Sequence, residues 1–331
     1  MKAIIWTKYG SPDGLVLKDI EKPVAQENEV LIRVRATSVF AGDAEMRALK
    51  LPMYFKIPLR LFFGLRSPRD KMILGQELAG EIEEVGEKVT NYQPGDRIFA
   101  AMGFDMGSYA EYKVMKANPT DGAISLKPEN MSFEEAATLP VGGLHALHFI
   151  REAKITQGQQ VLINGAGGSI GIIAIQLAKY YGAEVTVVDS TEKLEVLKRL
   201  GADYTIDYNK EDYRSTKMKY DVIFDVVGRN AHKNSFFGGF RSLKPEGIYM
   251  MANPKLRHSL IGKLLSKFSS KQIIASMVHY QHEDLLFLKK LVEDGVITTY
   301  IDRQYDLDEI VQAHQYVDSG KKIGNISVLI P

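Results

Sequence analysis

The segment Val161-Leu-Ile-Asn-Gly-Ala-Gly-Gly-Ser-Ile-Gly171 decides the fold of this 331-residue chain. Its first three residues, Val161–Ile163, are apolar and β-rich, which predicts a short buried strand. The apolar run Ile170–Tyr181 follows the glycines and predicts a helix. A strand that passes through a glycine-rich turn into a helix is typical of a βαβ unit. We therefore expect an α/β fold built on a parallel sheet.

The glycines of this turn predict a site for a dinucleotide. A helix N-terminus favours a pyrophosphate, because its unpaired N–H groups and its dipole attract negative charge. Gly165 and Gly168 let the backbone turn and approach the phosphates, and Gly171 lets the helix pack close to the strand. The alternative is a glycine-rich turn that binds no ligand. The loop residues expected to hold the cofactor are Gly165, Ala166, Gly167, Gly168, Ser169, Ile170 and Gly171.

Asp189 bears on which dinucleotide is bound. It stands 18 residues after Gly171, at the end of the next expected strand. A carboxylate there accepts hydrogen bonds from a ribose diol and repels a 2′-phosphate, which favours NAD. Ser190, Lys193 and Tyr208 could instead hold a 2′-phosphate, or Lys193 is a solvated helix charge and Tyr208 a packing residue. We expect NAD(P)H, with NAD favoured.

Strands and helices alternate after this segment, which predicts a doubly wound parallel sheet with right-handed crossovers. Further strands are expected at Glu184–Val188, Val222–Val227, Ile248–Met251 and Ile273–Ala275, and a helix at Glu192–Leu200 with Thr191 as its cap. Ligands of such sheets lie at the carboxyl ends of the strands. The residues expected there, beside the nicotinamide, are Val227, Gly228, Ala252 and Asn253.

The first hundred residues predict a different, all-β arrangement. Val30, Ile32 and Val34 alternate with other residues at the period of a strand, and glycines divide Ile73–Ala101 into short pieces. Gly107–Val114 is another expected strand. Near the middle, Ser132 and Glu135 form a capping box that opens a helix through Ala137. Past residue 280, helices are expected at Asp284–Val292 and Leu307–Val317 and a last strand at Ile326–Ile330.

Composition excludes several kinds of protein. Lys and Arg number 42 against 41 Asp and Glu, a net charge of +1, so neither a nucleic-acid nor a membrane partner is expected. The chain has no cysteine, which excludes disulfides, thiol nucleophiles and every Cys-ligated zinc site. Only Ala3–Trp6 precede Lys8, too short an apolar stretch for a signal peptide, so a soluble cytoplasmic protein is expected.

Motifs along nearly the whole chain resemble the medium-chain dehydrogenase/reductase superfamily, in its zinc-free quinone oxidoreductase-like branch. The motifs are Gly75-Gln-Glu-Leu-Ala-Gly80, Gly95-Asp-Arg-Ile-Phe99, Gly107-Ser-Tyr-Ala-Glu-Tyr112, Ala136–Ala146, Gly165–Gly171, Gly201-Ala-Asp203, Tyr220–Gly228 and Gly320–Asn325. The resemblance implies a GroES-like β-barrel domain, residues 1–126 and 281–331, around an inserted Rossmann domain, residues 127–280. It also implies a homodimer, which is common in the family.

The resemblance implies chemistry without zinc. Zinc-dependent members have Cys where Phe40 stands and His where Gln76 stands, so neither ligand is present. Without a Lewis acid, the expected reaction is hydride transfer from NAD(P)H to a quinone or an α,β-unsaturated carbonyl. The alternatives are a metal-free alcohol or carbonyl dehydrogenase, and a catalytically silent nucleotide-binding structural or regulatory protein.

Few side chains suggest catalysis or substrate binding. His145 stands where quinone oxidoreductases usually have Thr, and it either bonds the cofactor and protonates the enolate or only packs at the start of a helix. Leu51–Leu65 is unusually apolar and is a pocket wall, a part of the core or a membrane contact. The cluster of His279, His282, Glu283 and Asp284 is interpreted as a solvated surface, and no metal is expected. Residues expected to line the substrate pocket are Phe40, Tyr54, Phe55, Phe62 and Phe63.

Overall fold

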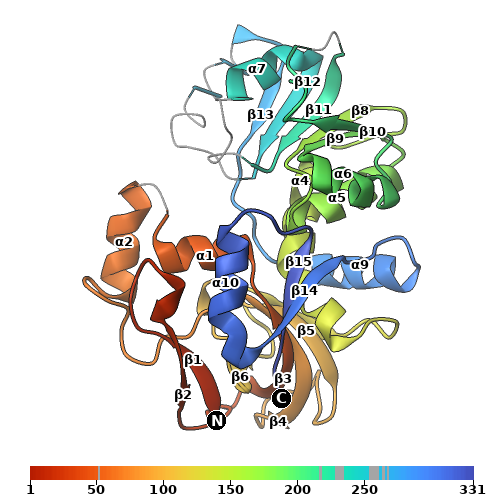
Figure 1. Cartoon of the computed structure of the whole chain (residues 1–331). Coiled ribbons are helices and arrows are strands. Elements are labelled where there is room, and N and C mark those ends of the chain that lie inside the picture. Colours follow the sequence, from red (N-terminus) through yellow and green to blue (C-terminus); the bar gives the residue numbers. More distant parts are fainter. Residues whose placement is uncertain (51–52, 216–217, 228–234, 253–260, 263–264, 267) are drawn as a thin grey trace. The chain divides into compact units, whose positions relative to one another are not determined.

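The computed structural model describes the chain except residues 51–52, 216–217, 228–234, 253–260, 263–264 and 267 (Figure 1). The side chains of residues 53–55 and 235 also lie outside the description. The chain forms two compact units. Unit 1 comprises Met1–Val141, His279–Gly295 and Thr299–Pro331, and unit 2 comprises Gly142–Val278 and Val296–Thr298. The division expected at residue 126 therefore lies at Val141.

Unit 1 is built around a seven-stranded sheet in which β14, β15, β3, β4, β5 and β7 follow one another and β6 pairs with β3. The hairpin of β1 (Lys2–Trp6) and β2 (Leu15–Asp19) stands beside it, closed by the 3-10 turn η1 (Pro12–Gly14). The sheet strands are β3 (Glu29–Ser38), β4 (Glu77–Val85), β5 (Arg97–Ala101), β6 (Tyr112–Lys116), β7 (Ala123–Leu126), β14 (Ile301–Asp306) and β15 (Asn325–Leu329).

Strand β3 carries the centre of the unit 1 core. Val30, Ile32 and Val34 are fully buried in one apolar cluster, as their alternation predicts. On the other face Leu31 is buried, but Arg33 is exposed and Arg35 is half-buried, so the two faces are unequal as the alternation predicts. Other elements, α3 among them, pack against β3.

Helices of unit 1 begin where the sequence supplies a cap or a break. The capping box is confirmed: Ser132 Oγ accepts the N–H of Glu135, whose carboxylate accepts the N–H of Ser132 in return. The expected strand Gly107–Val114 begins only at Tyr112. The helical elements are α1 (Ala41–Ala48), α2 (Met53–Phe63), η2 (Gly103–Asp105), α3 (Phe133–Ala136), α9 (His282–Glu293), η4 (Leu307–Glu309) and α10 (Ile310–Asp318). Helix α4 (Pro140–Glu152) begins in unit 1 and continues in unit 2.

Unit 2 contains a six-stranded sheet whose strands are all parallel, in the order β10-β9-β8-β11-β12-β13. The order reverses between β8 and β11, the topological switch point of a doubly wound fold. Its strands are β8 (Gln160–Asn164), β9 (Glu184–Asp189), β10 (Tyr204–Asp207), β11 (Tyr220–Asp225), β12 (Leu243–Met251) and β13 (Gln272–Ile274). The described helices beyond α4 are α5 (Ser169–Tyr180), α6 (Thr191–Arg199) and α7 (Ser235–Ser242). The predicted α/β fold is confirmed.

One predicted cap in unit 2 is wrong. Ser190, not Thr191, is the N-cap of α6, and no side chain caps that helix. Thr191 is the first helical residue, and its hydroxyl donates a hydrogen bond to the Asp207 carboxylate at the end of β10. The Thr191 hydroxyl, which was predicted to cap the helix, therefore bonds a residue of another strand instead. Among the described residues, no helix is both long and apolar enough to cross a bilayer.

Candidate functional site

Two glycines of the β8–α5 loop occupy positions that exclude a side chain. Gly165 has a φ of +81°, and a Cβ there would lie 2.2 Å from Val227 Cγ2. A Cβ on Gly171 would lie 2.3 Å from the carbonyl oxygen of Ala166. The first glycine therefore allows the turn, and the second allows α5 to pack closely on the loop.

Gly168 has a different role, because its surroundings are open. It is the N-cap of α5, with φ −99° and ψ 176°, and no side chain caps the helix. No heavy atom lies within 4 Å of a Cβ built on it. The first-turn N–H groups of a helix lack partners within the helix. An uncapped N-terminus approached across a bare glycine has the geometry of a phosphate site, so the residues present fit a dinucleotide.

Asp189, at the end of β9, holds the glycine loop in place. Its carboxylate is buried, accepting the N–H of Gly167 at 2.7 Å and the N–H of Ser190 at 2.9 Å. Lys193 Nζ lies 3.6 Å from it, and the lysine side chain is only 14% exposed. Lys193 is therefore not the solvated charge of the alternative interpretation. Tyr208 is exposed, and its N–H donates to the carbonyl oxygen of Asp189 at 3.2 Å. The structure thus brings all four predicted cofactor-selecting residues together.

The carboxyl ends of β8 and β11 are joined by a buried polar network that sequence analysis missed. Asn164 Nδ2 donates to Asp225 Oδ1 at 3.2 Å, and the Tyr249 hydroxyl donates to Asp225 Oδ2 at 2.8 Å. Asn164 is the last residue of β8 and Asp225 the last residue of β11, so the two lie at the switch point of the sheet. Polar side chains at the ends of two apolar strands were the signal that could have found them.

Main-chain hydrogen bonds connect Asn164 and Asp225 to the segments that contain the predicted nicotinamide contacts. Val226 donates its N–H to the carbonyl oxygen of Asn164 at 3.0 Å, and Ala252 donates to that of Asp225 at 3.1 Å. Val227 follows directly and packs on Gly165. The other two residues expected here, Gly228 and Asn253, lie outside the described residues.

His145 lies on α4, one turn after a residue that contacts the glycine loop. A Cβ on Gly142 would lie 2.8 Å from the carbonyl oxygen of Ser169, so α4 and the start of α5 pack closely. Burial, aided by the neighbouring His148, lowers the pKa of His145 to about 4. The imidazole is therefore uncharged at neutral pH, suited to hydrogen bonding and poorly suited to supplying a proton.

Unit 1 contains two buried carboxyl groups that sequence analysis also missed. Burial raises the pKa of Asp43 to about 7, although it accepts hydrogen bonds from Gln76 Nε2 at 3.2 Å and from the N–H of Phe40 at 3.0 Å. Burial likewise raises the pKa of Glu77 to about 7, although Ser38 Oγ and the N–H of Val141 donate to it. Nothing in their local sequence separates them from solvated carboxylates.

Comparison with known proteins identifies the family. Residues 26–123 match the alcohol dehydrogenase GroES-like domain, and residues 200–328 match a domain described as zinc-binding dehydrogenase. A 2-methylene-furan-3-one reductase of Solanum lycopersicum is 30% identical, over 99% of this chain and 79% of its own. The chain belongs to the medium-chain dehydrogenase/reductase superfamily. It is an oxidoreductase of the quinone oxidoreductase-like kind, as its motifs predict.

Two further relatives of this oxidoreductase agree with that placement. The NADPH-dependent alkenal/one oxidoreductase of Arabidopsis thaliana chloroplasts is 36% identical, over 69% of this chain and 58% of its own length. The structure of a quinone oxidoreductase from Coxiella burnetii superposes with a TM-score of 0.87 at 30% identity, covering 100% of this chain and 99% of that one. The GroES-like and Rossmann parts expected of the superfamily are therefore both present.

The two residues expected to stand at zinc-ligand positions, Phe40 and Gln76, make other contacts. Phe40 is the N-cap of α1, and the Gln76 amide donates to Asp43. His282 Nδ1 bonds the carbonyl oxygen of Ile124 at 2.8 Å. In the described part of the chain, no three His, Cys, Asp or Glu residues form a group that could hold a metal ion.

The residues predicted to line a substrate pocket divide into different environments. Phe63 is 1% exposed and packs in the unit 1 core, with its ring centroid 5.7 Å from that of Trp6. Phe62 is exposed on α2, and Phe40 is half-buried. The side chains of Tyr54 and Phe55 lie outside the described residues. Leu51–Leu65 thus contains both core and surface residues.

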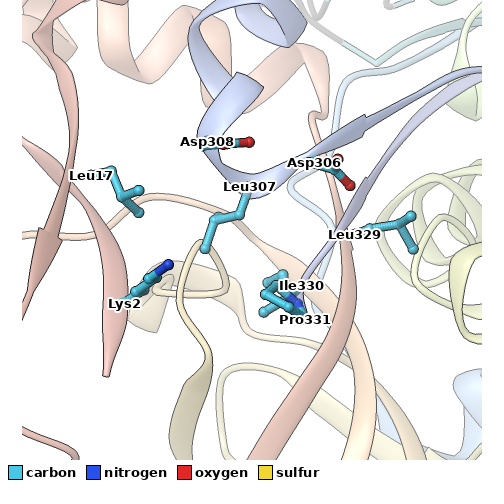
Figure 2. Close-up of a pocket in the computed structure, with 8 residues that line it drawn as sticks. All are labelled: Lys2, Leu17, Asp306, Leu307, Asp308, Leu329, Ile330 and Pro331. Carbon is cyan, nitrogen blue, oxygen red and sulfur yellow. The ribbon is translucent and has the colours of Figure 1, made fainter.

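Unit 1 also has an open groove of about 460 Å³ that contains none of the predicted site residues (Figure 2). One of its acids, Asp306, caps the 3-10 turn η4. Figure 2 shows a mixed lining of Lys2, Leu17, Asp306, Leu307, Asp308, Leu329, Ile330 and Pro331.

Proposed function

We propose that this oxidoreductase transfers a hydride from NAD(P)H to a quinone or an α,β-unsaturated carbonyl, without zinc. The observation that carries the proposal is the uncapped N-terminus of α5 behind Gly168, which fits the phosphates of a dinucleotide. When bound, the dihydronicotinamide supplies the hydride. The chain's own residues then have to hold the dinucleotide, orient the acceptor and exclude water.

The absence of zinc ligands supports the choice of acceptor. With no cysteine in the chain, and with Phe40 and Gln76 at the ligand positions, an alcohol or carbonyl oxygen would find no Lewis acid here. Quinones and enones need none, because they are already electron-poor. The tomato 2-methylene-furan-3-one reductase and the Arabidopsis alkenal/one oxidoreductase are named for acceptors of this kind.

Asp189 supports a preference for NADH. Each of its carboxylate oxygens accepts a main-chain N–H, which leaves further lone pairs for the hydroxyls of a ribose. A 2′-phosphate would meet the same buried negative charge. Lys193, beside Asp189, opposes this preference because its positive charge would attract a 2′-phosphate. The hydroxyls of Ser190 and Tyr208 would oppose it by donating hydrogen bonds to that phosphate. The relative named for NADPH shows that the opposite preference exists among similar enzymes.

His145 is proposed to orient the cofactor by a hydrogen bond to its ribose or carboxamide, since its uncharged imidazole both donates and accepts. Phe40, Tyr54 and Phe55 remain the predicted contacts of a flat apolar acceptor, whereas Phe62 is exposed on α2 and Phe63 is assigned to the core. A homodimer stays a prediction, which the solution mass of the purified protein tests.

The function is tested by following NADH and NADPH oxidation with 1,4-benzoquinone, 9,10-phenanthrenequinone and a simple enone as acceptors. We expect oxidation that survives a chelator and is not increased by Zn²⁺. Oxidation of a primary or secondary alcohol by NAD(P)⁺ would favour a metal-free dehydrogenase instead. Tight dinucleotide binding with no turnover on any acceptor would favour a silent binding protein, and stimulation by Zn²⁺ would contradict the zinc-free mechanism.

A further inference from the structure

Helix α2 has two apolar faces, only one of which is used inside the protein. On the inner face, Phe63 packs against Trp6, and Leu59 packs on the same core cluster. The Tyr9 hydroxyl donates to the carbonyl oxygen of Gly64, which holds the end of the helix against the hairpin. These contacts fix α2 on unit 1, where it stands out from the strands beyond α1 (Figure 1).

The outer face of α2 is apolar and exposed. Four large apolar side chains, which we call the α2 patch, are each between 60% and 63% exposed. Two of them are one helical turn apart, so they lie on one face. The patch consists of Ile57, Leu61 and Phe62 of α2 and of Leu65, which follows the helix. Single exposed apolar residues are common on soluble proteins, but four large ones between residues 57 and 65 mark a contact site.

The chain around the patch carries more positive than negative charge, although Glu45 and the exposed Asp70 flank it and Arg47 is buried and paired with Asp318. Residues 46–69 include six Lys and Arg residues and no Asp or Glu, in a chain whose net charge is only +1. Arg60, Arg66 and Arg69 are exposed, and Lys56 is half-buried. Arg60 lies over the Tyr9 ring, and Arg69 donates to the carbonyl oxygen of Leu61, but neither of these contacts neutralises the charge. Among the described residues, none of the four forms an ion pair.

We propose that the α2 patch docks on an anionic lipid surface, with its apolar side chains among the acyl chains and its cations at the headgroups. Exposed apolar residues accompanied along the chain by Lys and Arg are typical of a helix that lies in a membrane interface. A second copy of this chain fits less well, because a two-fold contact would place each cationic patch against itself. The near-zero net charge predicts no membrane partner only because acidic residues elsewhere conceal this local excess.

The test is vesicle co-sedimentation of the full chain, which needs neither cofactor nor activity and so stands apart from the proposed function. Phosphatidylcholine vesicles are compared with vesicles that also contain about 30 mol% phosphatidylserine. We expect at least about tenfold stronger binding to the anionic vesicles, because each cation near such a surface contributes about fivefold. The difference should disappear when the salt concentration rises from about 0.05 M to about 0.5 M.

Paired variants separate the two parts of the patch. Leu61→Ser with Phe62→Ser removes apolar contact, and Lys56→Glu with Arg66→Glu reverses charge; each pair should lower binding at least about tenfold. Phe104→Ser, at an exposed apolar residue of η2, and Lys18→Glu with Lys116→Glu, at exposed lysines of the strands, are the matched controls and should bind as the wild type does. Thermal unfolding checks that all variants are folded.

The proposal is overturned if neutral and anionic vesicles bind equally, or if the patch variants bind as strongly as their controls. It is also overturned if no vesicle binds while the patch variants change the sedimentation coefficient of the free protein, because the α2 patch would then be a contact between copies of the chain.

Discussion

Glu77 on β4 and Val141 in the first turn of α4 are joined by a hydrogen bond of 2.8 Å, in which a buried carboxylate accepts a main-chain N–H. The other carboxylate oxygen accepts the hydroxyl of Ser38. The carboxyl group thus holds two separate segments of unit 1 together, although burial raises its pKa to about 7.

This pKa predicts how stability depends on pH. Between the unfolded value of 4.5 and the folded value of about 7, the folded chain binds more protons at Glu77, so the free energy of unfolding falls as pH rises through that window. Glu77→Gln keeps a carbonyl for Val141 and an amide for the Ser38 oxygen. It should remove the part of this slope that Glu77 contributes, leaving that of Asp43, and stabilise the protein at pH 8 by about 1–3 kcal/mol. Urea unfolding at pH 5 and pH 8 measures it.

The control for this substitution is Glu81→Gln, on the same strand, where the carboxylate is half-buried and pairs with Arg35. It should lower stability slightly at both pH values. Equal pH slopes in the Glu77→Gln variant and the wild type would contradict the assignment.

Two glycine substitutions should separate folding from cofactor binding. Gly165→Ala forces a side chain onto a φ of +81° and into Val227, and should lower stability by about 1–3 kcal/mol. Gly168→Ala meets no neighbour, so the variant should unfold as the wild type does but bind dinucleotide at least about tenfold more weakly. Thermal unfolding and calorimetric titration with NADH measure the two effects. Unchanged affinity in Gly168→Ala would count against phosphates at this turn.

Removing the charge of Asp189 should change the choice of cofactor. Asp189→Asn keeps an oxygen for the N–H of Gly167 but no longer repels a 2′-phosphate, so the ratio of NADPH to NADH affinity should rise about tenfold or more. Lys193→Ala should move the same ratio in the opposite direction, because it removes the adjacent positive charge. If the ratio of NADPH to NADH affinity is unchanged in both variants, the 2′ position of the ribose does not lie beside Asp189 and Lys193.

Replacing His145 should affect turnover more than binding. His145→Ala is expected to lower kcat about tenfold or more while the NADH dissociation constant changes less than about threefold. With the His145 pKa at about 4, the kcat profile should show no inflection from this residue near pH 6.5. His148→Asn, which should keep a polar group near Ser276, is the control and should leave kcat unchanged. Normal turnover in His145→Ala would assign the residue to packing alone.

The local parts of the fold could be predicted because each depends on a few neighbouring residues. The strand at Val161, the glycine turn and the capping box at Ser132 are all local, and the structure has them where expected. The cap at Thr191 was wrong because its hydroxyl bonds Asp207 on another strand. A prediction from local sequence does not include such a partner.

The two buried carboxyl groups of unit 1 could not be predicted, for a related reason. Asp43 and Glu77 are acidic residues that accept hydrogen bonds from residues far away in the chain. Their desolvation follows from the assembled fold and not from neighbouring residues in the chain. The apolar stretch around α2 shows the same limit, because Phe62 and Phe63 are identical in sequence terms and opposite in exposure.

Strands β15 and β3 are neighbours in the sheet but far apart in the sequence, with Ser327 opposite Ser38. During synthesis on the ribosome, every strand of unit 2 emerges before β15 does. The parallel sheet can therefore assemble while the edge of β3 at Ala36–Ser38 has not yet paired with β15. An unpaired edge of that kind invites strand addition by other chains. Nascent chains stalled before residue 325 should therefore be the form of this protein that most needs a chaperone.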